Sequence, residues 1–325
     1  MLRHRQSWVQ DMRCQRPWRA PLALSSCVKI RATLVGTLVP ATGWQGAVLA
    51  VFPRAVNIAV DTYCISLVSD QQAMTSLSIT VPGLFQPARQ GLRAVLQSAT
   101  VVYMVGAHLR LAIDAATRLD IALTGAARWD GSLRASDVSG LALHRTDTLV
   151  RLLCHHGRAG GMLGLYAGET ATHPLLWPTI VSLRTEAERP QDGLSRLVGR
   201  GIGLTPSGDD FLTGVLLADC MVRYAGSAYC LPIDRQEIAS ALERTNTAGR
   251  TLLWQALQGA FPAYLLALAG WFSGAQAVSV AALESAEADF EPCLVRMLAH
   301  GHTSGTDAVV GFLWYLEHVK SMSRV

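Results

Sequence analysis

The sequence predicts an α+β protein, in which a β-rich antiparallel N-terminal domain is followed by a mainly α-helical C-terminal domain. Apolar and polar residues alternate with period two in the N-terminal part, and the spacing becomes helical after about residue 136. Half of the 325 residues are hydrophobic and only 16% are charged, so the chain can bury a large core. We expect a basic, disordered tail over residues 1–25, a β-rich domain over residues 26–135 and a helical domain over residues 136–325.

Strands are expected in the N-terminal domain because of its alternating side chains. Leu77, Ile79 and Val81 alternate with Ser78 and Thr80, and residues 109–113 repeat the pattern. Glycines and prolines interrupt these runs, which favours turns between antiparallel strands. The glycine segment, residues 157–168, is either a linker between the domains or a place of close backbone approach, and its composition favours the linker.

Helices are expected in the C-terminal domain. One helical face carries Leu141, Leu149, Leu152 and Leu153. Ser136 or Asp137 is available as the N-cap of this helix. Asp234 and Glu237 form a capping-box arrangement before a later helix.

Charge and cysteine content exclude several classes of partner. Much of the net charge of +4 comes from the tail, which carries Arg3, Arg5, Arg13, Arg16 and Arg19. A nearly neutral body without a basic stripe argues against nucleic acid. The uncharged stretch 251–283 is broken by Pro262 and several glycines, so it predicts a core helix and no membrane span. Seven scattered cysteines without a C-x-x-C pair indicate a cytoplasmic protein with no disulfide framework.

Two loops rich in hydroxyl groups and glycine give the strongest functional signal. The first loop is GLTPSGDD (203–210) and the second loop is GHTSGTD (301–307), and an apolar helix follows each. Both copies contain Ser-Gly-x-Asp-x-x-x-Gly, which ends at Gly214 and Gly311. Glycine allows close backbone approach, and the free amides and dipole of a helix start attract anions. The two terminal glycines would let the helices pack closely and bring both loops to one site.

These loops supply the candidate site residues. We predict that an anion is bound by Arg200, Gly201, Gly203, Thr205, Ser207, Gly208, Thr303, Ser304 and Gly305. His302, Asp210 and Asp307 are the candidate catalytic groups, since His302 is the only histidine in either loop. Capping the helix does not require two adjacent carboxylates, so Asp209 and Asp210 are candidate ligands of a divalent metal such as Mg²⁺. The sequence identifies no other cofactor. A structural interpretation, with the serines as N-caps and the aspartates as first-turn acids, stays open.

Long segments of the chain resemble a known family. GRGIGLTPSGDDFLTGVLLA (199–218) and GHTSGTDAVVGFLW (301–314) are similar to two signatures of the bacterial AllH-type family, and the resemblance covers most of residues 45–315. The family includes a subunit of oxamate carbamoyltransferase, which works with two other protein subunits in allantoin and purine nitrogen degradation.

The resemblance implies a cytoplasmic hetero-oligomer and a carbamoyl-transfer reaction. Oxalurate and phosphate would give oxamate and carbamoyl phosphate, or the reverse, so the implied ligands are small anions. Two alternatives stay open. In the first alternative, the chain is a noncatalytic assembly subunit. In the second, it is a metal-dependent phosphotransferase or hydrolase that uses Asp209, Asp210 and Asp307.

Overall fold

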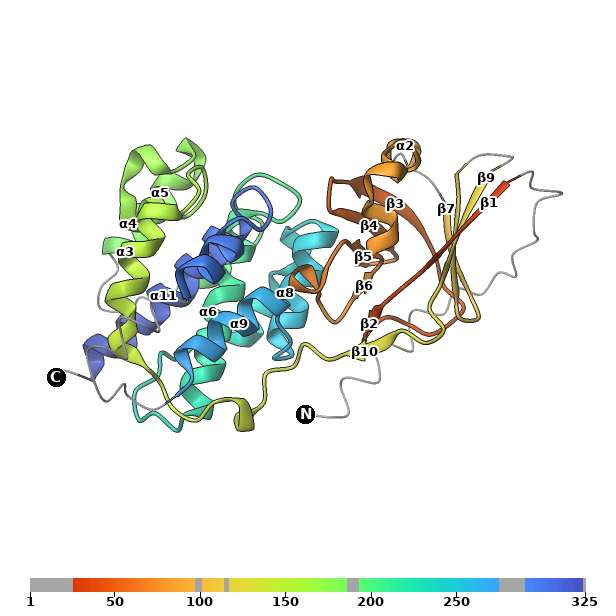
Figure 1. Ribbon diagram of the computed structural model, residues 1–325. Helices are drawn as coiled ribbons and strands as arrows, with labels where there is room; N and C mark the ends of the chain where they lie inside the picture. Colours follow the sequence, from red (N-terminus) through yellow and green to blue (C-terminus); the bar gives the residue numbers. More distant parts are fainter. Residues whose placement is uncertain (1–25, 97–100, 114–116, 186–192, 275–289, 324–325) are drawn as a thin grey trace. The chain divides into compact units, whose positions relative to one another are not determined.

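The structure is a computed structural model that describes residues 26–96, 101–113, 117–185, 193–274 and 290–323 (Figure 1). The chain divides into two compact units, residues 1–131 and 132–325. We describe each unit by itself. The expected disordered tail, residues 1–25, lies outside the described residues.

The first unit is built on one ten-stranded sheet. Its strands are β1 (Ser26–Arg31), β2 (Leu34–Gly36), β3 (Gln45–Val51), β4 (Ala55–Val60), β5 (Tyr63–Val68), β6 (Ser78–Thr80), β7 (Val101–Val105), β8 (His108–Ala112), β9 (Thr117–Ala122) and β10 (Ala127–Trp129). Their spatial order is β1-β9-β8-β7-β3-β4-β5-β6-β2-β10. The β-rich N-terminal part is confirmed. Most pairs are antiparallel, as expected, but β1–β9, β5–β6 and β2–β10 are parallel.

The alternation of apolar and polar residues predicts where these strands lie, but it does not always predict which of their side chains are buried. In β8, Leu109 and Leu111 are fully buried, and the other three residues are partly exposed. In β6 the polar Ser78 and Thr80 are buried together with Ile79, so both faces of this strand are covered. The Ser78 hydroxyl accepts a hydrogen bond from the Thr75 amide at 3.2 Å, which offsets the loss of water.

The second unit is helical, as the sequence predicts. Its helices include α3 (Thr146–His156), α4 (Gly164–Ala167), α5 (Trp177–Thr185), α6 (Ser207–Tyr224), α7 (Arg235–Ser240), α8 (Thr247–Leu257), α9 (Ala263–Phe272) and α11 (Ser304–Met322), and residues 290–298 are also helical. The two longest, α6 and α11, pack along one another (Figure 1, green and blue). Every residue of α6 from Ser207 to Val222 is buried. Within the described ranges, no helix has the length and apolar character that a membrane span needs.

The first residue of a helix agrees with the sequence-based prediction only where a side chain caps the helix. The expected N-cap at Ser136 or Asp137 is wrong, because Asp137 closes a short 3₁₀ turn by accepting from the Arg134 amide and α3 begins only at Thr146. Asp234 does cap α7, since it accepts from the Glu237 amide at 2.8 Å. The Glu237 side chain does not complete the capping box with the Asp234 backbone and instead accepts from the Ser195 hydroxyl.

Candidate functional site

The crossing of α6 and α11 brings the two loops together. A Cβ atom at Gly214 would lie 1.8 Å from the Ala308 carbonyl oxygen, and one at Gly311 would lie 2.0 Å from the Phe211 carbonyl oxygen. Only glycine lets two helix backbones approach this closely. Past the crossing, the Oγ1 of Thr205 in the first loop lies 2.9 Å from the Oγ of Ser304 in the second. The expectation that the loops meet is therefore confirmed.

The sequence repeat is also a structural repeat. A Cβ atom at Gly208 would lie 2.1 Å from the Leu197 carbonyl oxygen, and one at Gly305 would lie 2.0 Å from the Met297 carbonyl oxygen. In both copies, the glycine that follows the serine packs against a carbonyl of the preceding turn. The second position of each Ser-Gly pair therefore requires glycine for the same reason.

Asp210 is fully buried at the start of α6, and hydroxyl groups surround its carboxyl. Thr205 Oγ1 lies 3.0 Å from Asp210 Oδ2, and the Ser304 hydroxyl of the opposite loop also interacts with this carboxyl. Burial raises the pKa of Asp210 well above its ordinary value, and the nearby charge of Asp307 raises it further. Burial and the neighbouring charge therefore both favour the protonated form of Asp210.

Asp307 has the equivalent place in α11 and is also fully buried. Its Oδ1 accepts a hydrogen bond from the Met162 amide at 2.6 Å, while its Oδ2 has no hydrogen-bond partner in the described part of the chain. Burial is the main cause that raises the pKa of Asp307 to about 6, although the Met162 amide and the Ser207 and Thr303 hydroxyls act in the opposite direction. Each aspartate thus interacts with the serine of the opposite loop.

The Asp209 carboxyl has different hydrogen-bond partners from that of its neighbour Asp210. It accepts from the Gly199 amide at 2.7 Å and from the Thr245 hydroxyl, and burial raises its pKa to about 6. Gly249 packs against this carboxyl so closely that a Cβ atom there would lie 2.0 Å from it. Among the described residues, no group of three or more His, Cys, Asp or Glu side chains is placed to hold a metal ion. Metal binding by this aspartate pair stays a prediction.

Free backbone amides lie at residues 201–205, where the glycine turn, residues 199–203, leads into the first loop. Gly199, Gly201 and Gly203 have φ values of 75°, 111° and 107°, and the exposed Arg200 and Ile202 separate them. Within the described part of the chain, no amide from residue 201 to residue 205 donates to an oxygen atom. Successive free amides in a turn of this kind form a concave site for an anion.

The first-turn amides of the two helices are less available than the sequence suggests. The amides of Gly208 and Asp209 donate to the carbonyls of Arg200 and Pro206, each at 2.8 Å, and the Gly305 amide donates to a carbonyl in the same way. The expectation that the helix starts present unpaired amides is wrong for these residues. Anion binding would depend on the glycine turn and on side chains.

The glycine segment, residues 157–168, forms part of the candidate site, so the linker interpretation is wrong. Besides the Met162 amide, it supplies Arg158, whose Nη1 donates to the Gly301 carbonyl at 2.8 Å. Gly161 packs directly on the Asp307 carboxyl, where a Cβ atom would lie 2.1 Å from Oδ1. His302 is exposed, and its ring lies beside this segment. Sequence reasoning missed Arg158 and Met162, and the density of glycine was the only available signal.

Tyr264 of α9 also borders the two aspartates. It is buried and its ring stacks on His300, with 4.5 Å between the ring centroids. Burial raises the pKa of Tyr264 well above its ordinary value, and the charges of Asp210 and Asp307 raise it further. Nothing in the local sequence distinguishes Tyr264 from an ordinary core residue.

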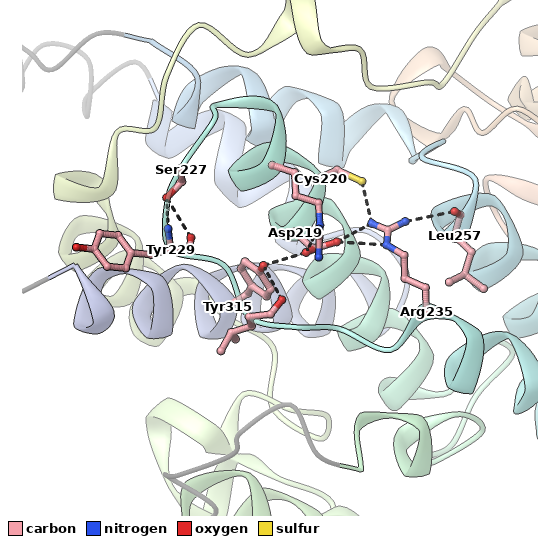
Figure 2. Close-up of polar contacts among 9 residues, drawn as sticks. Asp219, Cys220, Ser227, Tyr229, Arg235, Leu257 and Tyr315 are labelled. Carbon is pink, nitrogen blue, oxygen red and sulfur yellow. Dashed lines mark hydrogen bonds and ion pairs between the residues drawn. The ribbon is translucent and has the colours of Figure 1, made fainter. Parts of the chain in front are cut away.

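A second polar cluster, nearer the other end of α6, has a different character (Figure 2). The fully buried Asp219 accepts from Arg223 and Arg235, each at 2.8 Å, and from the Tyr315 hydroxyl at 2.9 Å. Arg235 also donates to the sulfur of Cys220 at 3.2 Å. These contacts connect α6, α7 and α11. Every oxygen of the Asp219 carboxyl already has a partner, so the cluster stabilises the helix packing.

Comparison with known proteins agrees with this geometry. Residues 197–316 match the model of the family described as oxamate carbamoyltransferase subunit AllH. The matched segment contains both loops and the crossing of α6 and α11. The resemblance seen in the sequence is confirmed over this segment. No curated protein and no solved structure matches the chain.

Proposed function

Because residues 197–316 match the AllH family model, we propose that the chain is a subunit of an oxamate carbamoyltransferase and binds its small anionic substrates where the two loops meet. The observation that carries the proposal is the contact of the loops, with 2.9 Å between the Thr205 and Ser304 hydroxyl oxygens. The reaction would convert oxalurate and phosphate into oxamate and carbamoyl phosphate, or run in reverse, together with two partner subunits.

The charges around the loops suit such ligands. The free amides of residues 201–205 can donate to carboxylate or phosphate oxygens, and the exposed guanidinium groups of Arg200 and Arg158 lie on the adjoining turns. Burial favours the neutral form of Asp210, which reduces the negative charge that would otherwise repel an anion. The loops thus offer donors for an anion, and burial of the three aspartates favours their neutral forms.

The reaction requires stabilisation of a developing negative charge and donation of a proton to the leaving nitrogen. A phosphate oxygen attacks the carbamoyl carbon, and negative charge develops on the carbonyl oxygen, where preorganised amides stabilise it. The oxamate nitrogen then needs a proton as its bond to the carbamoyl carbon breaks. The candidate proton donors are those that the sequence predicts, namely His302, Asp210 and Asp307, and His302 is the one that is exposed.

The test is phosphorolysis of oxalurate by the complex assembled with its partner subunits. Gly201→Ala places a Cβ atom 2.7 Å from the Ser207 amide at a φ of 111°, so it should distort the glycine turn and lower turnover at least 100-fold. Gly226→Ala is the matched control, because Gly226 also has a positive φ but no atom lies within 4 Å of the added carbon. Equal turnover of the Gly201→Ala and wild-type complexes would contradict the proposal.

A noncatalytic role in the same complex is the second candidate. The pairing of the Gly208, Asp209 and Gly305 amides with backbone carbonyls favours it, because these groups serve the packing of the helix starts. It predicts that Gly201→Ala weakens assembly of the complex and leaves the turnover per assembled complex unchanged. Size-exclusion chromatography beside the activity assay separates the two candidates.

A further inference from the structure

The glycine segment contains a turn, residues 158–161, that the second loop and the start of α11 hold in place. The Arg158 amide donates to the Thr306 hydroxyl at 3.0 Å, and the Arg158 Nη1 donates to the Gly301 carbonyl at 2.8 Å. Thr306 is fully buried, so its contact with the turn is shielded from water. The backbone and the guanidinium of Arg158 are therefore both fixed.

This arrangement extends the internal repeat by one position. The third residue of each Ser-Gly-x-Asp copy accepts a backbone amide from a glycine-rich segment. Thr306 accepts the amide of Arg158, and Asp209 accepts that of Gly199 at 2.7 Å. Each segment carries an exposed arginine, Arg158 in one and Arg200 in the other. The repeat therefore places one arginine on the turn that adjoins each loop.

The turn at residues 158–161 has donors without a partner. Among the described residues, Arg158 forms no ion pair, and its Nε and Nη2 donate to no protein atom. No described residue accepts the amides of Ala159 or Gly161, which flank Gly160 with its φ of 107°. Gly161 is buried, and a buried amide without a partner is rare in proteins. These donors are therefore arranged to receive an acceptor from a ligand.

The free edge of the guanidinium favours a carboxylate as that acceptor. Because Nη1 is engaged by the Gly301 carbonyl, Nε and Nη2 remain, and this edge pairs with both oxygens of a carboxylate. Asp307 is the acidic group that packs on Gly161, but it is fully buried and its Oδ1 accepts from the Met162 amide. Arg158 is exposed, so a ligand that arrives from water meets the positive group.

We propose that residues 158–161 bind the carboxylate group of oxamate or oxalurate, and that Thr306 positions Arg158 for this contact. The inference rests on the proposed function and goes further, because it assigns one end of the substrate to one turn. The rest of the substrate is then left to the donors where the two loops meet.

Calorimetry with oxamate and oxamide tests the assignment, because oxamide replaces the carboxylate with a neutral amide of similar shape. The assembled wild-type complex should bind oxamate about 10-fold more tightly than oxamide, as expected for a charge-assisted pair. Arg158→Gln should reduce this preference to less than about threefold. Arg128→Gln changes an exposed arginine of the first unit that also donates to a carbonyl, and it should keep the wild-type preference.

Thr306→Val tests the positioning role, because it keeps the size of the side chain and removes the oxygen that accepts the Arg158 amide. KM for oxalurate should rise about fivefold while kcat stays within about twofold, since the contact binds substrate and takes no part in the chemical step. Thr306→Ser restores the hydroxyl and should recover the wild-type KM. Thr213→Val is the matched control, since its buried hydroxyl donates within α6, and it should keep the wild-type KM.

A failure of this carboxylate site is distinguishable from a failure of the proposed function. A wild-type complex that neither binds oxamate nor transfers a carbamoyl group would contradict the proposed function. An active complex whose preference for oxamate over oxamide survives Arg158→Gln would overturn the carboxylate site alone. If Arg158→Gln instead weakens binding of inorganic phosphate and leaves that preference unchanged, the turn binds phosphate and the assignment is wrong. If Thr306→Val does not fold, Arg158→Gln decides, because its side chain is exposed.

Discussion

At the scale of single residues, the burial of Asp210 and Asp307 decides the character of the site. The sequence identifies both residues through the repeated Ser-Gly-x-Asp pattern, and the structure places both inside the helix pair. Their partners could not be predicted, because the Met162 amide and the side chain of Tyr264 come from distant segments. The repeated pattern identifies the two aspartates, but the packing of the helices determines whether their side chains are buried or exposed.

Burial of Asp307 predicts a pH dependence of stability. Its pKa is about 6 in the folded chain and 3.8 for an ordinary exposed aspartate, so the folded state binds the proton more tightly. This contribution to stability is complete below pH of about 4 and is lost as the pH rises through about 6. Between pH 4 and pH 8, Asp307→Asn should therefore gain about 2.5 kcal/mol of unfolding free energy relative to wild type, measured by urea denaturation.

The control for this prediction is Asp147→Asn, which changes an exposed aspartate that pairs with Lys320. Its effect on the free energy of unfolding should be nearly the same at both pH values. A difference between Asp307→Asn and wild type that does not vary with pH would show that the Asp307 carboxyl is not held in its protonated form by burial.

Arg158 should contribute to anion binding, although nothing in its local sequence marks it as a ligand. One nitrogen of its guanidinium donates to the Gly301 carbonyl, and the side chain is exposed. Arg158→Gln should weaken oxamate binding to the assembled complex about 10-fold in calorimetry, as loss of a charge-assisted hydrogen bond does. Arg128→Gln is the control, since its exposed guanidinium donates to the Thr37 carbonyl in the first unit. Equal weakening by both substitutions would rule out a specific role for Arg158.

At the scale of secondary-structure elements, the contact between α6 and α11 holds the site together. The helices themselves were predictable from their apolar sequences, and Gly214 and Gly311 indicated close packing. The start of α3 and the parallel pairing of β1 with β9 were not predictable. Local sequence carries no strong signal for these two features. The start of α3 has no side-chain cap, and β1 and β9 are far apart in the chain.

The helix contact predicts a large effect of one methyl group. Gly214→Ala places its Cβ atom 1.8 Å from the Ala308 carbonyl oxygen, and the backbone must move to relieve the clash. We expect a loss of about 3 kcal/mol of unfolding free energy, measured by urea denaturation. Gly270→Ala in α9 meets no atom within 4 Å and should be neutral or stabilising by up to about 1 kcal/mol. Similar effects of both substitutions would refute the close crossing.

At the scale of the whole molecule, the β-rich and helical parts follow from the change in hydrophobic period along the chain. Among the described residues, the core cluster that includes α6 and α11 is formed from residues between Leu133 and Met322. We therefore expect the second unit, residues 132–325, to fold without the first and to unfold cooperatively, as followed by circular dichroism. A disordered or aggregated product would show that the second unit depends on the first.

We propose that both loops bind one ligand. Hydrogen exchange of the assembled complex, with and without oxamate, tests it most directly, because the amides of residues 201–205 are free in the structure and should exchange quickly. Oxamate should slow exchange at residues 201–205 and, at the same concentration, at residues 301–304. Saturating oxamate that protects neither loop, or only one of them, would contradict the claim.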